Sequence, residues 1–287
     1  MLKPAFLKNE AFLADITRTL RSQAHGLWWL GQSGFLVVQQ GRALLLDPYL
    51  SDSLTRKYEK TDKPHTRITE QVVNPAALAA LGVIELITSS HNHTDHFDPE
   101  TLQPLLAENS RTRLLIPAAN RQLAIERLPS SADRLLEIDA GQSVTVADIR
   151  ISAVPSAHPT IEHDAAGRCR FLGYVVQWAG VTIYHSGDTL WHDDLVSSLR
   201  PFRIDLALLP INGDRPERKV AGNLDGRQAA QVAHAIGARW VIPCHFGLFE
   251  FNTASPDEFV AECERLGQPH RVLRNGEGWA WNGAPRP

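Results

Sequence analysis

Apolar positions near the start of the chain follow first a helical and then a strand pattern. Residues 1–24 predict an amphipathic helical extension, because one side of such a helix would carry Phe12, Leu13, Ile16 and Leu20. Short apolar runs follow, separated by glycines, at residues 28–30, 35–38 and 44–47. Runs of this kind, bounded by glycine turns, are typical of a meander of β-strands.

Strand and helix patterns alternate through the rest of the chain. Helices are expected at 75–81, from Asp98 onward, and at 118–128, 192–199, 225–236 and 256–266. Strands are expected at 84–89, 113–116, 134–138, 143–154, 170–178, 181–185, 206–209 and 240–244, and near Val272 and Trp279. The charged, weakly patterned segment 51–74 predicts a lid loop. We therefore expect a single α/β (α+β) domain over residues 1–287, an αββα sandwich with two mixed sheets face to face and helices outside.

Composition narrows the classes of function. The chain has 287 residues and a formal net charge of −3, and it has no long basic run, which argues against a nucleic-acid partner. No apolar run approaches the ~20 residues of a transmembrane helix, and the N-terminus lacks a signal-peptide pattern. The three cysteines are too few for a disulfide framework, so a cytoplasmic location is expected.

The sequence HNHTDH at residues 91–96 carries the strongest chemical signal. An apolar strand leads directly into it, and Asp98-Pro99 marks a helix start just beyond. Imidazole and carboxylate groups bind Zn²⁺, and Mn²⁺ and Fe²⁺ accept the same groups. In an extended segment His91 and His93 point the same way, whereas Asp95 and His96 can face a second position. This spacing predicts two metal ions.

Further ligands for two metals are expected where other strands end. His158, Asp188 and His245 each follow an apolar run, at the point where the chain leaves the predicted sheet. Asp188 is the natural bridging ligand, because one carboxylate can offer an oxygen to each cation.

Together and in this order, these residues resemble the metallo-β-lactamase superfamily of metal-dependent hydrolases. Within it, the segments WWLGQSGF (28–35), LDPYL (46–50), SHNHTDHFD (90–98), YHSGDT (184–189) and ALLPINGD (207–214) are similar to the branch of L-ascorbate-6-phosphate lactonases. SHNHTDHFD also resembles the N-acylphosphatidylethanolamine phospholipase D branch. At His158 the chain departs from some of the lactonases, which have a carboxylate there.

The resemblance implies a role for each matching residue. His91, His93 and His158 would bind one metal, Asp95, His96 and His245 the other, and Asp188 would bridge them. Asp47 would lie behind the ligands and hydrogen-bond to their loop. We expect a metal-bridging hydroxide to attack the substrate, with Asp95 orienting it.

Other polar residues are open to two interpretations. His192 is either a proton donor at the site or an exposed residue at a helix start, and His185 is expected to be structural. The loop bearing Asn212, Arg215 and Arg218 is either an anion-recognising substrate loop or a solvated turn.

Three functions remain open on the sequence alone. The first is a hydrolase that opens a lactone or ester of a small, optionally phosphorylated, sugar acid. The second is a phosphodiesterase, and the third is a non-catalytic metal-stabilised binding protein. For either enzyme the expected partner is a small-molecule substrate, and self-association into a homo-oligomer stays open.

Overall fold

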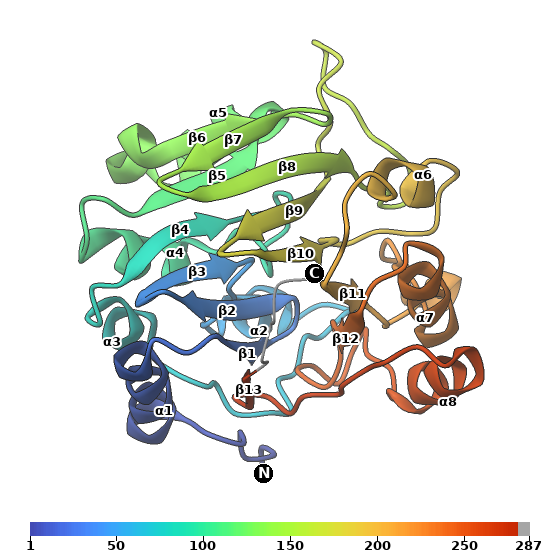
Figure 1. Cartoon of the computed structure of the whole chain (residues 1–287), viewed down its shortest axis with the longest axis horizontal. Coiled ribbons are helices and arrows are strands. Elements are labelled where there is room, and N and C mark those ends of the chain that lie inside the picture. Colours follow the sequence, from blue (N-terminus) through green and yellow to red (C-terminus); the bar gives the residue numbers. More distant parts are fainter. Residues whose placement is uncertain (281–287) are drawn as a thin grey trace.

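Two β-sheets packed face to face form the centre of the protein in this computed structural model, which describes residues 1–280 (Figure 1). The first sheet has seven strands in the order β13-β1-β2-β3-β4-β5-β6. Its strands are β1 (Gly26–Gly31), β2 (Gly34–Gln39), β3 (Arg42–Leu46), β4 (Ile84–Thr88), β5 (Arg113–Pro117), β6 (Leu135–Ile138) and β13 (Gly278–Ala280). The expected αββα architecture is confirmed. Residues 281–287 of the predicted 1–287 domain lie outside the described residues.

The second sheet has six strands in the order β12-β11-β10-β9-β8-β7. They are β7 (Ser143–Val146), β8 (Ile149–Pro155), β9 (Leu172–Trp178), β10 (Val181–His185), β11 (Leu206–Pro210) and β12 (Trp240–Cys244). The strand predicted at 143–154 is in fact the β7–β8 hairpin, because Ala147 adopts a positive φ of 53° and reverses the chain. The strand expected near Val272 is absent from the described residues, and only an isolated bridge joins His270 to Val241.

Helices cover the outer faces of both sheets (Figure 1). These are α1 (Asn9–Ser22), α3 (Pro75–Ala79), α4 (Pro99–Ala107), α5 (Arg121–Arg127), α6 (Leu195–Leu199), α7 (Gly226–Ala235) and α8 (Asp257–Leu266). A further helix, α2 (Ser53–Tyr58), packs through Leu54 against Tyr49, Leu248 and Phe249 instead. Short 3₁₀ turns are η1 (Ala118–Asn120), η2 (Pro129–Arg134) and η3 (Pro216–Arg218). The predicted cap of α4 is confirmed, since the Asp98 side chain accepts a hydrogen bond from the Thr101 amide.

Strands β1, β2 and β3 of the first sheet are buried on both faces, which explains their nearly continuous apolar sequence. In β1, Leu27 and Trp29 belong to the core between the sheets, whereas Trp28 and Leu30 face the layer of α1 and α4. A strand between a sheet and a layer of helices has no polar face. Strict alternation is therefore missing from this part of the sequence.

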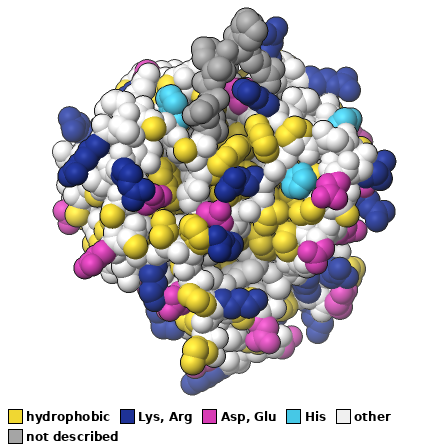
Figure 2. Space-filling model, turned by 60° about the horizontal axis from the view of Figure 1, so that its bottom comes forward, with side chains coloured by type: hydrophobic (Ala, Val, Ile, Leu, Met, Phe, Trp, Pro, Cys, Tyr) yellow, Lys and Arg dark blue, Asp and Glu magenta, His cyan; other side chains and the backbone are white. Residues whose placement is uncertain are grey.

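The surface carries charges of both signs. On the face shown in Figure 2, Lys and Arg side chains are interspersed with Asp and Glu, and hydrophobic side chains lie between them. None of the helices described within residues 1–280 is both long and apolar enough to cross a bilayer.

Candidate metal centre

The polar side chains of the site come from strand ends that meet at one edge of the sandwich. Strands β3 and β4 are parallel, and β10, β11 and β12 are parallel in the other sheet. β8 runs in the same direction as β10, because both are antiparallel to β9 between them. The carboxyl ends of these strands therefore lie at a common edge, where the following loops carry the predicted metal ligands.

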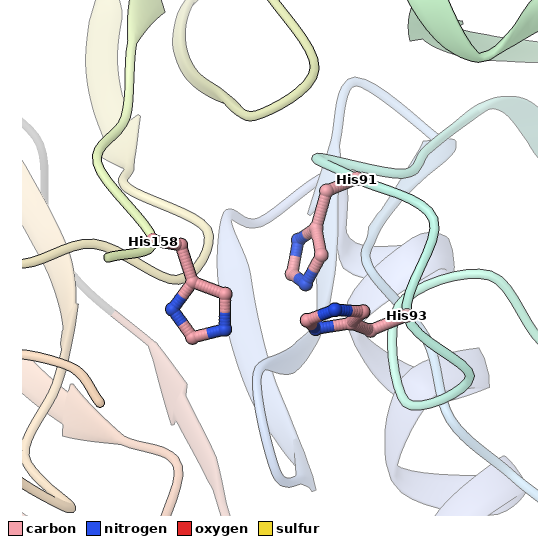
Figure 3. Close-up of side chains that lie close together, drawn as sticks. All are labelled: His91, His93 and His158. Carbon is pink, nitrogen blue, oxygen red and sulfur yellow. The ribbon is translucent and has the colours of Figure 1, made fainter. Parts of the chain in front are cut away.

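Three histidines form the first group of donors. His91 and His93 lie on the loop after β4, His158 follows β8 in the other sheet, and their rings point toward one another (Figure 3). One nitrogen from each lies within 4.8 Å of the others. His158 Nδ1 donates to the carbonyl of Gly222 at 2.9 Å, which leaves its Nε2 free to face the group. This arrangement suits a single cation bound by three imidazoles.

A second group contains carboxylates as well as histidines. One donor atom from each of Asp95, His96 and His245 also lies within 4.8 Å of the others. Asp188 lies between the two groups: its Oδ1 is 3.2 Å from His96 Nε2, and its Oδ2 is 3.3 Å from His245 Nε2 and 3.7 Å from His158 Nε2. The position of Asp188 is thus compatible with contact to both groups.

Asp47 lies behind these donors and orients two of them. His96 Nδ1 donates to Asp47 Oδ2 at 2.7 Å, and the Ser90 hydroxyl bonds to the same carboxylate and lies 3.0 Å from His91 Nδ1. Because Nδ1 of both rings is engaged, Nε2 of both faces the site. Both Nε2 atoms are buried; that of His91 has no hydrogen-bond partner, and that of His96 faces Asp188 Oδ1 at 3.2 Å without a well-formed hydrogen bond. Unpartnered buried nitrogens in this geometry fit a metal ion, which would supply the missing interaction.

Electrostatic surroundings differ between the donors. Burial and the neighbouring histidines lower the pKa of His91 well below its ordinary value, so this ring is neutral and able to bind a cation. Burial also acts on His96 and His245, but the carboxylates of Asp188 and Asp95 outweigh it. They raise the pKa of His96 well above its ordinary value and that of His245 to about 9. Without a metal, this second group consists of buried ion pairs.

Gln32 is a site residue that the sequence analysis did not single out. It lies in the turn between β1 and β2 with a positive φ of 50°, an uncommon backbone conformation for a residue other than glycine. Its side chain donates from Nε2 to Asp95 Oδ2 at 3.0 Å, and its carbonyl accepts from the His245 amide at 2.8 Å. Gln32 therefore positions one residue from each of two distant loops.

A cavity of about 510 Å³ opens onto these groups. Part of its lining is the polar cluster of His93, Asp95, His158, Asp188 and His245. The remaining walls come from segment 51–74, from Asn92 and Thr94, and from Arg127, Val220, Ala221 and Asn252. A volume of this size accommodates a small organic molecule next to the cluster.

Comparison with known proteins agrees with this geometry. The family model described as "Beta-lactamase superfamily domain" matches residues 42–246, which is more than half of the chain. The chain belongs to the metallo-β-lactamase superfamily. It is a metal-dependent hydrolase.

Curated relatives and solved structures are similar to this superfamily member over most of its length. A UPF0173 metal-dependent hydrolase of Chloroflexus aurantiacus is 30% identical over 64% of this chain and 73% of its own length. A second one, from Opitutus terrae, is 29% identical over 88% of this chain and 97% of its own. The structure of Igni18, a metallo hydrolase of Ignicoccus hospitalis, has a TM-score of 0.65 at 20% identity, over 91% of this chain and 100% of that one. At this level of identity, the similarity to Igni18 concerns the fold alone.

Three residues singled out from the sequence of this hydrolase do not line the cavity themselves, although Asn212 and Arg218 hydrogen-bond to the lining residue Asn252. Asn212, Arg215 and Arg218 are not among its described lining residues. Arg218 instead donates to the carbonyls of Asn212 and Thr253, both at 2.7 Å, and thereby joins its own loop to the loop after β12. The observed contacts favour the interpretation of this loop as a structural turn.

The two histidines near Asp188 also have positions of their own. His192 lies before α6, is half-buried, and does not appear among the described residues that line the cavity. His185 is buried at the end of β10, and its Nε2 donates to the carbonyl of Ser33 at 2.8 Å. His185 thus ties the β1–β2 turn to the loop that bears Asp188.

Proposed function

We propose that this hydrolase binds two divalent cations, one at His91, His93 and His158 and the other at Asp95, His96 and His245, with Asp188 between them. The observation that carries the proposal is the convergence of buried imidazole nitrogens, among them the unpartnered Nε2 of His91, and of carboxylates beside an open cavity. All the donors are nitrogen or oxygen, which suits Zn²⁺ or Mn²⁺ and also admits Fe²⁺. Asp47 would stand behind the ligands and fix their orientation.

The residues of the chain would prepare the site for hydrolysis. A pair of divalent cations supplies Lewis acidity, which makes a water molecule nucleophilic near neutral pH and polarises the oxygen of an ester or phosphate. Asp95, to which Gln32 donates at 3.0 Å, would orient the attacking water while it binds the metal. His91 and His96 hold fixed ring orientations through Ser90 and Asp47, so little reorganisation is needed during the reaction.

For the substrate, we propose a lactone or ester of a small sugar acid. The cavity supports this choice because it combines apolar side chains, Leu54 and Val220, with polar ones, Asn92 and Asn252, within a volume suited to one small molecule. The segment 51–74 would cover such a substrate, since Leu54, Tyr58 and His65 form one wall. All three cysteines are free and buried, which suits a reducing compartment such as the cytoplasm.

Metal analysis followed by a substrate panel tests this proposal. We expect two equivalents of metal per chain, and hydrolysis of δ-gluconolactone and related lactones that stops after chelation and returns with Zn²⁺ or Mn²⁺. Bis(p-nitrophenyl) phosphate serves as the competing substrate. Turnover of the diester alone would show a phosphodiesterase instead. Two bound metals without turnover of either class would favour the metal-stabilised binding protein.

A further inference from the structure

Three basic side chains line the cavity around the candidate metal centre: Lys57, Lys63 and Arg127. Lys57 reaches Thr94 Oγ1 at 3.3 Å, and Arg127 donates to the carbonyl of Asn92 at 2.8 Å. Asn92 and Thr94 alternate with the donors His91, His93 and Asp95 along the loop. Two cations therefore flank the loop that carries the metal-binding donors.

Lys63 lines the cavity beside the residues that follow Lys219. Its Nζ donates to the carbonyl of Lys219 at 2.5 Å, next to the lining residues Val220 and Ala221. The adjoining residue Gly222 accepts the Nδ1–H of His158, so this wall also leads to the metal centre. The three cations thus surround the same space from different elements.

None of these three basic side chains forms an ion pair within the described part of the chain, whereas neighbouring basic side chains do. Arg56 pairs with Glu100, Arg67 with Asp52 at 2.6 Å, and Lys219 approaches Asp62 at 4.0 Å. The only carboxylates among the described lining residues are Asp95 and Asp188, and both are engaged with His245. Within residues 1–280, the positive charge of these three side chains is therefore left without a carboxylate partner.

Aromatic packing holds the lysine-bearing segment in place. The rings of Tyr58 and His65 lie 4.6 Å apart, and His65 packs against Phe249 at 5.4 Å and Phe251 at 5.2 Å. His65 Nδ1 also donates to the carbonyl of Lys63 at 2.8 Å. The two lysines are thus presented from a packed support, which lowers the entropic cost of recruiting them to a ligand.

We propose that Lys57, Lys63 and Arg127 form an anion subsite, which binds a phosphate monoester or carboxylate group of the substrate while its ester group faces the metal centre. This inference rests on the proposed function, and it defines the substrate as a small organic anion. Unpaired cations inside a concave, partly desolvated site attract an anion more strongly than the same charges on an open surface. The proposed subsite therefore assigns anion recognition to residues that line the cavity, in place of Arg215 and Arg218.

Matched substrates test the subsite during turnover. Phosphorylated gluconolactone and p-nitrophenyl succinate carry an anion, whereas δ-gluconolactone and p-nitrophenyl acetate do not, so the two pairs separate phosphate from carboxylate recognition. In Lys57→Met and Lys63→Met we expect KM for the preferred anionic substrate to rise about tenfold each, with kcat and the neutral substrates unchanged. Arg56→Met is the matched control, because Arg56 is exposed and already paired with Glu100, and its KM values should equal those of the wild type.

Binding of inorganic phosphate and of succinate gives a readout that does not depend on hydrolysis. Calorimetric titration of the full chain, as purified and after metal removal, should show about tenfold weaker binding of one anion in each lysine variant and no change in Arg56→Met. Such a loss would support the subsite even if no lactone or ester is hydrolysed, in which case the proposed reaction alone fails. If the double variant Lys57→Met/Lys63→Met binds both anions like the wild type and keeps its KM values, the subsite is refuted, whatever the reaction.

Discussion

The two donor groups of the metal centre lie side by side but differ in electrostatic character. The first group consists of the imidazoles of His91, His93 and His158, and burial keeps His91 neutral. The second places His96 and His245 against Asp95 and Asp188, whose charges raise the pKa of both histidines. The first group is thus ready for a cation, whereas the second must exchange protons for one. Substitutions and changes of pH test this difference.

The largest effect is expected from Asp188→Ala, because Asp188 contacts both groups. In this variant, His96 and His245 lose the carboxylate whose oxygens lie 3.2 Å and 3.3 Å, respectively, from their Nε2 atoms. Activity should fall to background and metal content should drop at both positions. The metal-free protein should lose about 3–5 kcal/mol of unfolding free energy, as a buried ion pair does when one partner is removed. Plasma mass spectrometry and urea unfolding measure these effects, and retention of two metals with full activity would contradict the assignment.

His93→Ala should abolish activity with much less damage to the fold. His93 is exposed at the cavity and forms no ion pair in the described structure, so the unfolding free energy of the metal-free protein should change by less than about 1 kcal/mol. One equivalent of metal should remain, at the Asp95, His96 and His245 group. If the unfolding free energy falls as much as in Asp188→Ala, the two groups do not differ in their electrostatic contribution to stability.

A smaller effect is expected when Gln32 no longer positions Asp95. Gln32→Asn shortens the side chain but tolerates the positive φ, so it removes the bond to Asp95 Oδ2 without straining the backbone. Metal affinity at the second group should weaken about 10–100-fold, as for other residues that orient metal ligands. Competition with a fluorescent chelator measures both sites. Equal weakening at the His91, His93 and His158 group would show a general loss of structure instead.

The mildest test is the dependence of metal affinity on pH. The pKa of His245 is raised from 6.5 to about 9, so this ring holds a proton at pH 7 that a metal must displace. Affinity at the second group should rise by up to about tenfold per pH unit and per proton as pH increases from 7 to 9. Calorimetry in buffers of different ionisation enthalpy should detect the released protons.

The same pKa shift sets the stability of the metal-free protein. The ion pairs of His245 contribute fully to the unfolding free energy below pH 6.5. This contribution is lost as pH rises through about 9, because the folded state holds the proton of His245 more tightly than the unfolded chain does. Unfolding free energy that increases over this range would contradict the ion-paired second group.

Local patterns predicted most elements of the fold but missed features that depend on single turns. The capped start of α4 followed directly from Asp98-Pro99. Ala147 gave no comparable signal, since nothing local marks an alanine for the positive φ that divides β7 from β8. The segment 51–74 was predicted as a loop, yet it contains α2 and packs His65 against Phe249. That packing pairs residues nearly two hundred positions apart, and no local pattern records it.

By itself, the sequence determined which side chains could bind metal, because donor type and strand-end position are local properties. HNHTDH, His158, Asp188 and His245 were all named from those two properties, and the structure brings them together. Only the tertiary structure decided how those donors are charged and what surrounds them. The proton held by His245 depends on Asp95 and Asp188, and the unpaired charge of Arg127 depends on the loop bearing Asn92. Both follow from distances between segments far apart in the chain, and Coulombic interactions depend on those distances rather than on sequence separation.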